Sequence, residues 1–134
     1  MKKVLVLEGG FNEEHEVSLR TSKEVQKSLK RMKLKFEVLK VNPKNFSEKI
    51  KLYDKDFLCF NALHGTYGED GTIQKILEKN KLSYTHSDSK ASKIGFDKNL
   101  TKLKIKNSEV VTIESIILER NQIKINLLYK IYNK

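Results

Sequence analysis

Several residue types that mark particular classes of protein are scarce in this chain of 134 residues. It has one cysteine, Cys59, and no tryptophan. A single cysteine excludes an internal disulfide framework and a cysteine-rich zinc site. No apolar run approaches the length of a bilayer span, and the lysines at positions 2 and 3 lead into only a short apolar run. We therefore expect no membrane helix, no signal peptide and no membrane partner, and the sequence predicts a cytoplasmic protein.

Arginine is also scarce, although the chain is strongly basic. The net charge is +10, yet of 27 basic residues only Arg20, Arg31 and Arg120 are arginine. Arginine is the better residue for bidentate recognition of bases and phosphates, and the lysines are interleaved with acidic residues instead of forming one patch. The sequence therefore does not favour nucleic acid as the main partner. A steep salt dependence of binding to arbitrary DNA would support that alternative.

Apolar residues make up 38% of the chain, which is enough for a packed core. Short apolar runs alternate with segments of helical spacing, a pattern typical of βαβ units. This predicts an α/β fold: a small, doubly wound, Rossmann-like parallel sheet with helices on both faces. The expected strands are 4–7, 36–41, 57–63, a short piece at 82–85 and a β-branched segment at 110–118; the expected helices are 13–32, 46–52, 71–78, 89–96 and 97–104.

Five of the six glycines follow two of the predicted strands: Gly9 and Gly10 after the first, and Gly65, Gly68 and Gly71 after the third. In open parallel sheets ligands bind at the carboxyl ends of the strands. If the first and third strands are neighbours, their two loops face one crevice; the alternative is that both are ordinary tight turns. Neither loop has a G-x-G-x-x-G or P-loop pattern, so the sequence does not support NAD binding.

The loop after the third strand carries the most chemistry. His64 ends a buried strand beside glycines, which favours a site residue over an ordinary structural histidine. Asp70 precedes a predicted helix and is expected to be its N-cap, while Glu69 is expected to accept backbone hydrogen bonds within the loop. In the first loop, Asn12 is expected to be the N-cap of the following helix.

Three motifs together resemble one family. Residues 64–71 match H-G-x-x-G-E-D-G, residues 9–19 are similar to G-G-x-S-x-E-x-E-V-S-L, and residues 84–98 are similar to Y-T-G-S-G-x-x-A-S followed by M-D-K. Their order and spacing resemble those of D-alanine–D-alanine ligases. The resemblance covers residues 2 to about 106, so we expect a Rossmann-like N-terminal substrate domain at 1–106. Residues 107–134 are then an incomplete start of an ATP-grasp unit or a tail.

The resemblance implies an activity and its partners. Ligases of this family use ATP to phosphorylate the carboxylate of one D-alanine, and the amine of a second D-alanine attacks the acyl phosphate, yielding the dipeptide of peptidoglycan precursors. Magnesium or manganese ions neutralise the phosphates, so positioning and charge stabilisation dominate the chemistry. Members of the family are often homodimeric.

The resemblance also assigns residues. Glu14 matches the glutamate that binds the ammonium group of the first D-alanine, and Val17 and Ser18 match the segment lining that subsite. His64, followed by Gly65, matches the histidine beside the reacting carboxylate and acyl phosphate, where a hydrogen-bond donor stabilises negative charge. Glu14 and His64 are the catalytic candidates.

Lys98 matches a lysine that reaches the nucleotide phosphates, and no residue is assigned to a metal. Among the departures from the family pattern, four bear on the structure. Phe11 replaces a small or polar residue. Lys75 replaces a small one, so the helix there is expected to pack less closely or to lie exposed. His86 and Asp88 replace two glycines, which is expected to strain or alter that loop.

Nothing after residue 106 resembles the ATP-grasp motifs that carry the main ATP and metal sites in the family. We therefore expect this chain to be inactive alone, as a fragment, a truncated product or a half-site. The alternative is a non-catalytic small-molecule-binding or pairing module. Apolar residues of this region, namely Ile116, Ile117, Leu127 and Leu128, are expected to be exposed.

Overall fold

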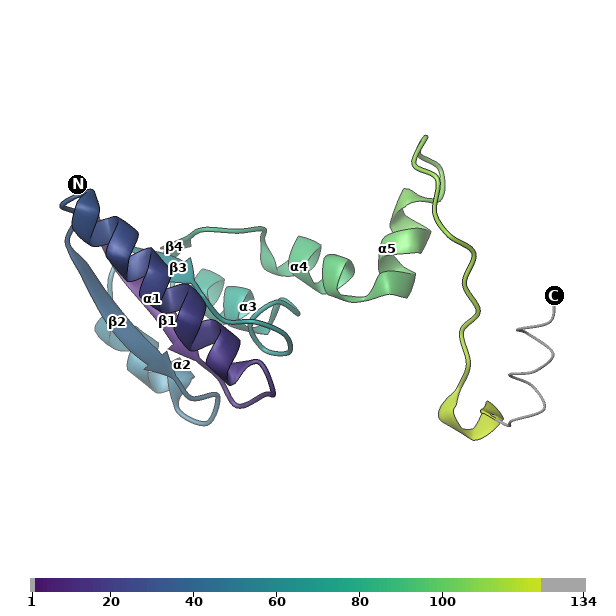
Figure 1. The fold of residues 1–134 in the computed structure, drawn as a ribbon, viewed down its shortest axis with the longest axis horizontal. Helices are drawn as coiled ribbons and strands as arrows, with labels where there is room; N and C mark the ends of the chain where they lie inside the picture. The colour runs from purple at the N-terminus through teal and green to yellow at the C-terminus, as the bar shows by residue number, and fades with distance from the viewer. Residues whose placement is uncertain (1, 124–134) are drawn as a thin grey trace.

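The computed structural model of the chain describes residues 2–123 and shows an α/β fold (Figure 1). Four strands form a parallel sheet in the order β2-β1-β3-β4. Their bounds are β1 (Lys3–Gly9), β2 (Phe36–Val41), β3 (Phe57–Asn61) and β4 (Ser83–Tyr84). The predicted fold class is confirmed, and so is the prediction that the first and third strands are neighbours.

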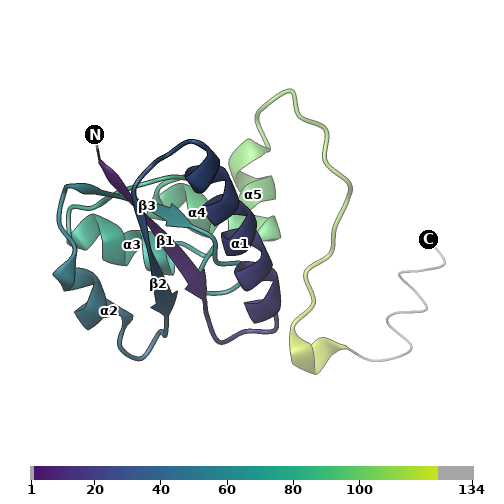
Figure 2. The ribbon, with the colours of Figure 1, turned by 60° about the vertical axis from the view of Figure 1, so that its left-hand side comes forward.

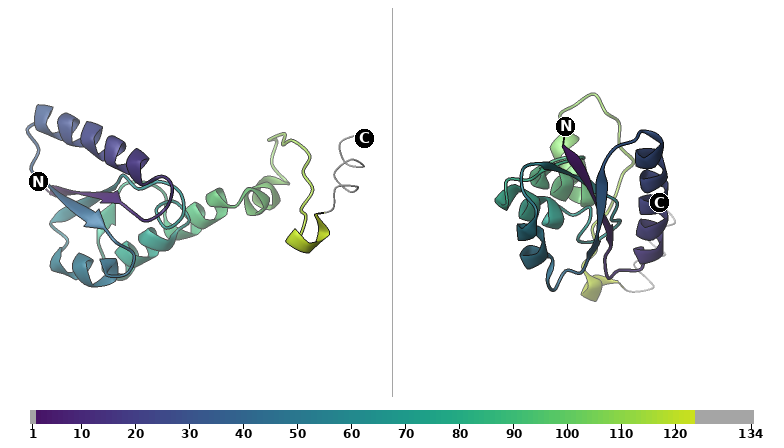
Figure 3. Two further views of the ribbon diagram at one scale, coloured as in Figure 1. Left: turned by 60° about the horizontal axis from the view of Figure 1, so that its bottom comes forward. Right: turned by 90° about the vertical axis from the view of Figure 1, so that its left-hand side faces the viewer.

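Helices cover both faces of the sheet (Figure 3). Helix α1 (His15–Arg31) lies on one face, and α2 (Phe46–Lys49), the 3-10 turn η1 (Ile50–Leu52) and α3 (Thr72–Lys79) lie on the other. The central strand β1 alternates between two apolar clusters: Leu5 and Leu7 pack with side chains of α2 and α3, whereas Val4 and Val6 pack under α1. Burial on both faces explains why this strand is a continuous apolar run.

Two further helices, α4 (Ser89–Phe96) and α5 (Lys98–Ile105), extend beyond the sheet (Figures 1 and 2). Asp88 accepts a hydrogen bond from the amide of Ala91 at 2.7 Å and caps α4, and Asp97 caps α5 in the same way. The aspartate at position 88 therefore supplies a helix cap where the ligase motif has glycine. Within residues 2–123, no helix is long and apolar enough to cross a membrane.

Beyond α5 the described chain forms only a short 3-10 turn, η2 (Arg120–Gln122). The strand predicted at 110–118 is wrong: these β-branched residues have no neighbouring strand in the described chain, and a strand needs a partner for its backbone hydrogen bonds. Ile116 and Ile117 are 64% and 63% exposed, as expected. Leu127, Leu128 and most of the apolar stretch at 123–132 lie outside the described residues.

Cys59 is expected to resist thiol reagents while the chain is folded. Its side chain is fully buried in the core, and this burial raises the pKa of the thiol to about 11. Since the thiolate is the reactive species, alkylation at neutral pH requires the core to open. Iodoacetamide labelling followed by mass measurement should therefore be slow in buffer and fast in denaturant. Equal rates in the two conditions would contradict this.

Candidate functional site

Two loops meet at the carboxyl edge of the sheet: the first loop (residues 10–14, after β1) and the second loop (residues 62–71, after β3). Asn12 joins them. Its side-chain amide nitrogen donates hydrogen bonds to the carbonyl oxygens of His64 at 2.7 Å and Thr66 at 3.0 Å, while its Oδ1 accepts from the amide of Glu14 at 3.0 Å. The N-cap of α1 is Glu14, so the capping role predicted for Asn12 is wrong. The amide group of Asn12 instead reaches across to the second loop.

Glu14 lies against the second loop at Gly65. A Cβ atom on Gly65 would come within 2.5 Å of the Glu14 Oε2 and 3.0 Å of the Asn12 Nδ2, and Gly65 has a left-handed φ of +66°. The exposed carboxylate of Glu14 has no basic side chain within 4 Å among residues 2–123. It lines a cavity of about 310 Å³ together with Gly65 and Glu69.

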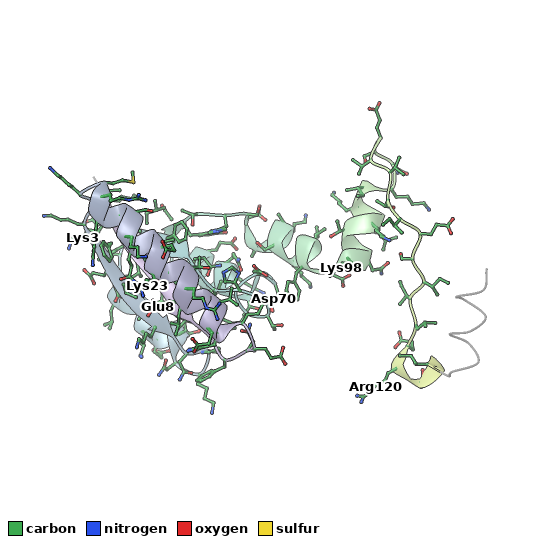
Figure 4. All side chains as sticks on the ribbon, viewed as in Figure 1. Lys3, Glu8, Lys23, Asp70, Lys98 and Arg120 are labelled. Carbon is green, nitrogen blue, oxygen red and sulfur yellow. The ribbon has the colours of Figure 1, made fainter. Side chains whose placement is uncertain are left out.

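The half-buried imidazole of His64 lines a second cavity of about 750 Å³, which also includes Lys98 at the start of α5. Glu69 and Phe96 line both cavities, so the two are adjacent. The second loop and Lys98 lie on the same side of the sheet domain (Figure 4, where Asp70 and Lys98 are labelled). The structure thus brings Glu14, Gly65, His64 and Lys98 to one edge.

Two carboxylates hold the shape of the second loop. Glu69 Oε2 accepts from the amide of Gly65 at 3.0 Å, as expected. Asp70 accepts from the amides of Tyr67 at 3.0 Å and Thr72 at 2.9 Å. Burial by itself would raise the pKa of Asp70, but these hydrogen bonds outweigh it and the pKa is lowered. Asp70 therefore stabilises the fold while ionised, and this stabilisation is lost as the pH falls through its lowered pKa.

The position of Asp70 corrects one prediction. The N-cap of α3 is Gly71, with φ at +90°, and Asp70 lies one residue earlier. Beneath the loop, the buried side-chain amides of Asn61 and Gln74 both donate to the carbonyl oxygen of Gly68 at 2.8 Å. These two contacts were not predicted, because nothing in their spacing indicates that both side chains meet one carbonyl group.

Ser18 and Val17 occupy different environments on α1. Ser18 is fully buried, and its hydroxyl oxygen accepts a hydrogen bond from the amide of Gly9 at 2.9 Å. That contact holds the turn after β1, so Ser18 supports the first loop from beneath. Val17 is exposed on the same helix.

The residues that depart from the ligase motifs differ in backbone conformation and exposure. His86 has φ at +88°, the left-handed conformation that glycine adopts without strain, so the expected strain is present in the backbone. Its ring packs edge-on against Phe60, with ring centroids 5.6 Å apart. Lys75 is exposed on α3, as expected, and Phe11 is also exposed.

The fold and the joined loops define a Rossmann-like domain with two polar loops at the carboxyl edge of its sheet, the edge at which open parallel sheets bind ligands. No family model matches the chain. Among curated proteins, it is 41% identical over 128 residues to a D-alanine–D-alanine ligase of Pelagibacter ubique, covering 95% of this chain and 41% of the relative. A D-alanine–D-alanine ligase of Thermotoga sp. (strain RQ2) is 40% identical over 99 residues, covering 74% of this chain and 32% of the relative.

A search of solved structures also finds D-alanine–D-alanine ligases. The D-alanine–D-alanine ligase from Bacillus anthracis complexed with ATP matches with a TM-score of 0.79 and 31% identity, covering 97% of this chain and 44% of that one. The resemblance predicted from the three motifs is therefore confirmed, and the chain belongs to the D-alanine–D-alanine ligase family. It spans about two fifths of the length of the curated relatives that it matches first.

Proposed function

We propose that this chain is the N-terminal portion of an ATP-dependent D-alanine–D-alanine ligase and contributes the subsite for the first D-alanine and part of the acyl-phosphate site. One observation carries the proposal: Asn12 ties the two loops together so that the carboxylate of Glu14 lies at Gly65, next to His64. A carboxylate and an imidazole at one edge suit the two ends of a small amino acid.

Glu14 is proposed to bind the ammonium group of D-alanine. An acceptor-only carboxylate without a basic neighbour in the described chain forms a charge-assisted hydrogen bond with an incoming cation. The small cavity at Glu14 and Gly65 has room for an amino acid of this size. Val17 and Ser18 complete this side of the subsite, Ser18 by holding the loop from below.

His64 and Lys98 are proposed to face the reacting carboxylate and the phosphates. Both line the larger cavity, so the ammonium group of Lys98 and the polar ring of His64 lie where negative charge gathers. ATP with magnesium or manganese supplies the phosphoryl group that activates the carboxylate. Lys98 is the residue of this chain that we expect to contact the nucleotide. The described residues 2–123 contain no group of three or more side chains suited to hold a metal ion.

The remaining parts of the proposal follow the family. Residues 1–106 form the substrate domain, and residues 107–134 are a tail or an incomplete start of the ATP-grasp unit. The chemistry then also requires residues from the three fifths of the relatives' length that this chain does not span. We expect the chain alone, mixed with ATP, Mg²⁺ and D-alanine, to release no phosphate at a ligase rate. A cytoplasmic location and homodimer formation are proposed on the same ground.

Neutralising Glu14 tests the proposal directly. In a nuclear magnetic resonance titration, D-alanine should shift the amide signals of residues 10–14 and 64–66. Glu14→Gln should weaken binding by roughly tenfold or more, because a hydrogen bond to a charged group contributes about 1.5–3 kcal/mol. Glu16→Gln, which changes an exposed carboxylate in the first turn of α1, is the matched control. D-lactate, which lacks the ammonium group, should not bind; equal binding of D-lactate and D-alanine would overturn the proposal.

A further inference from the structure

Each ring nitrogen of His64 lies near an oxygen atom of another side chain, one from α1 and one from the second loop. Its Nε2 lies 2.8 Å from the hydroxyl oxygen of Thr21, in the second turn of α1. Its Nδ1 lies 3.6 Å from Oε1 of Glu69, in the second loop. The other oxygen of Glu69 accepts from the amide of Gly65, so this carboxylate is held in place by the loop itself.

Glu69 discriminates between the two neutral tautomers of His64. An ionised carboxylate is acceptor-only, so it attracts a proton on Nδ1 and repels a lone pair there. A proton on Nδ1 leaves a lone pair on Nε2, and Thr21 then donates its hydroxyl hydrogen to that lone pair. Histidine free in water prefers the proton on Nε2. The contacts at His64 therefore favour the reverse of the usual tautomer.

We infer that Glu69 and Thr21 are positioning residues of the site: Glu69 fixes the tautomer of His64, and Thr21 fixes the orientation of its ring. The inference rests on the proposed function insofar as His64 acts on the substrate. A hydroxyl suits this task because it both donates and accepts. When His64 gains a proton on Nε2, the hydroxyl of Thr21 rotates and accepts a hydrogen bond from that N–H. Neither Thr21 nor His64 has to release a proton for this change. The ring is thus hydrogen-bonded in the same place in both charge states.

The tautomer is measured on the 134-residue chain labelled with ¹⁵N at histidine, without any ligand. At about pH 8.5, above the ordinary histidine pKa, long-range proton–nitrogen spectra distinguish the two neutral forms. We expect His64 to carry its proton on Nδ1. Glu69→Gln, which replaces the charged acceptor by a neutral amide of similar shape, should lower the Nδ1–H to Nε2–H ratio about fivefold, the effect of about 1 kcal/mol. Thr21→Val, which removes only the hydroxyl from a side chain of similar shape, should remove the hydrogen bond at Nε2 and thereby change the nitrogen chemical shift of Nε2. Thr21→Ser, which keeps the hydroxyl, should restore that chemical shift.

His15 is an internal control in the same spectra. Its Nδ1 lies 2.9 Å from the carbonyl oxygen of Gly10, which only accepts, so His15 holds its proton on Nδ1 independently of Thr21. If Thr21→Val does not fold, Glu69→Gln still measures the effect of the carboxylate on the tautomer. An unchanged His64 tautomer in folded Glu69→Gln, or an unchanged Nε2 chemical shift in folded Thr21→Val, overturns the inference. A chain with the expected tautomer that does not bind D-alanine overturns the proposed function alone.

Discussion

Gly65→Ala is expected to abolish measurable D-alanine binding while the sheet remains folded. The new Cβ would lie 2.5 Å from the Glu14 Oε2 and 3.0 Å from the Asn12 Nδ2, so the carboxylate of Glu14 has to leave its position at the small cavity and the amide of Asn12 has to shift slightly. The left-handed backbone at this residue adds about 1–2 kcal/mol of strain for any residue with a Cβ. Amide signals of residues 10–14 in a D-alanine titration report the effect.

Gly95→Ala is the matched control for this change. Gly95 lies within α4, and a Cβ atom there meets no atom within 4 Å. Alanine in a helix interior is favoured over glycine by roughly 0.5–1 kcal/mol, so this variant should be slightly more stable and bind D-alanine as the unaltered chain does. Normal binding by Gly65→Ala would show that Glu14 and Gly65 do not form the subsite.

Asn12→Asp is expected to be the second most damaging change. In the unaltered chain, the side-chain nitrogen of Asn12 lies 2.7 Å from the carbonyl oxygen of His64 and 3.0 Å from that of Thr66. The introduced carboxyl keeps one acceptor for the amide of Glu14 but turns a negatively charged oxygen toward these two carbonyl oxygens. Two hydrogen bonds are lost and a repulsion is added, so we expect a loss of about 2–3 kcal/mol in the free energy of unfolding, with weaker D-alanine binding. Urea denaturation measures the loss.

The pH dependence of the unfolding free energy of Asn12→Asp distinguishes repulsion by the new carboxylate from a general packing defect. Facing carbonyl groups raise the pKa of the introduced carboxyl above its unfolded value, so the destabilisation is full at neutral pH and shrinks as the pH falls and the group gains a proton. Asn99→Asp in the first turn of α5 is the matched control, because a negative charge there is favourable at a helix N-terminus. Identical unfolding midpoints for Asn12→Asp and the unaltered chain would refute the bridging role of Asn12.

Predictions from the sequence were most accurate where local pattern and final packing agree. The apolar run at 4–7 became the central strand β1, and the helix at 89–96 was predicted with the bounds that α4 has. The strand predicted at 110–118 failed because β-branched residues favour a strand only where another strand pairs with it. Residue propensity contains no information about such a partner.

The site was predicted only in part for a related reason. Glycines and charged residues after two strands indicated the loops, and the ligase motifs indicated Glu14 and His64. The contacts of Asn12 and Thr21 with residue 64 join positions 52 and 43 residues apart, and each depends on how α1 and the second loop lie relative to the sheet. A rule based on local spacing assigned Asn12 to the nearest helix end, whereas its side chain bonds to a distant loop.

The bridge between the two loops has a consequence for the order of assembly during folding. Asn12 reaches the second loop only after β1 has paired with β3, and those strands are separated by α1, β2 and α2. Contacts of such long range form late, since the intervening chain must first lose its freedom. The small cavity between the two loops is thus absent from partly folded states. Any ligand that occupies it binds the native state alone and raises the melting temperature with its concentration.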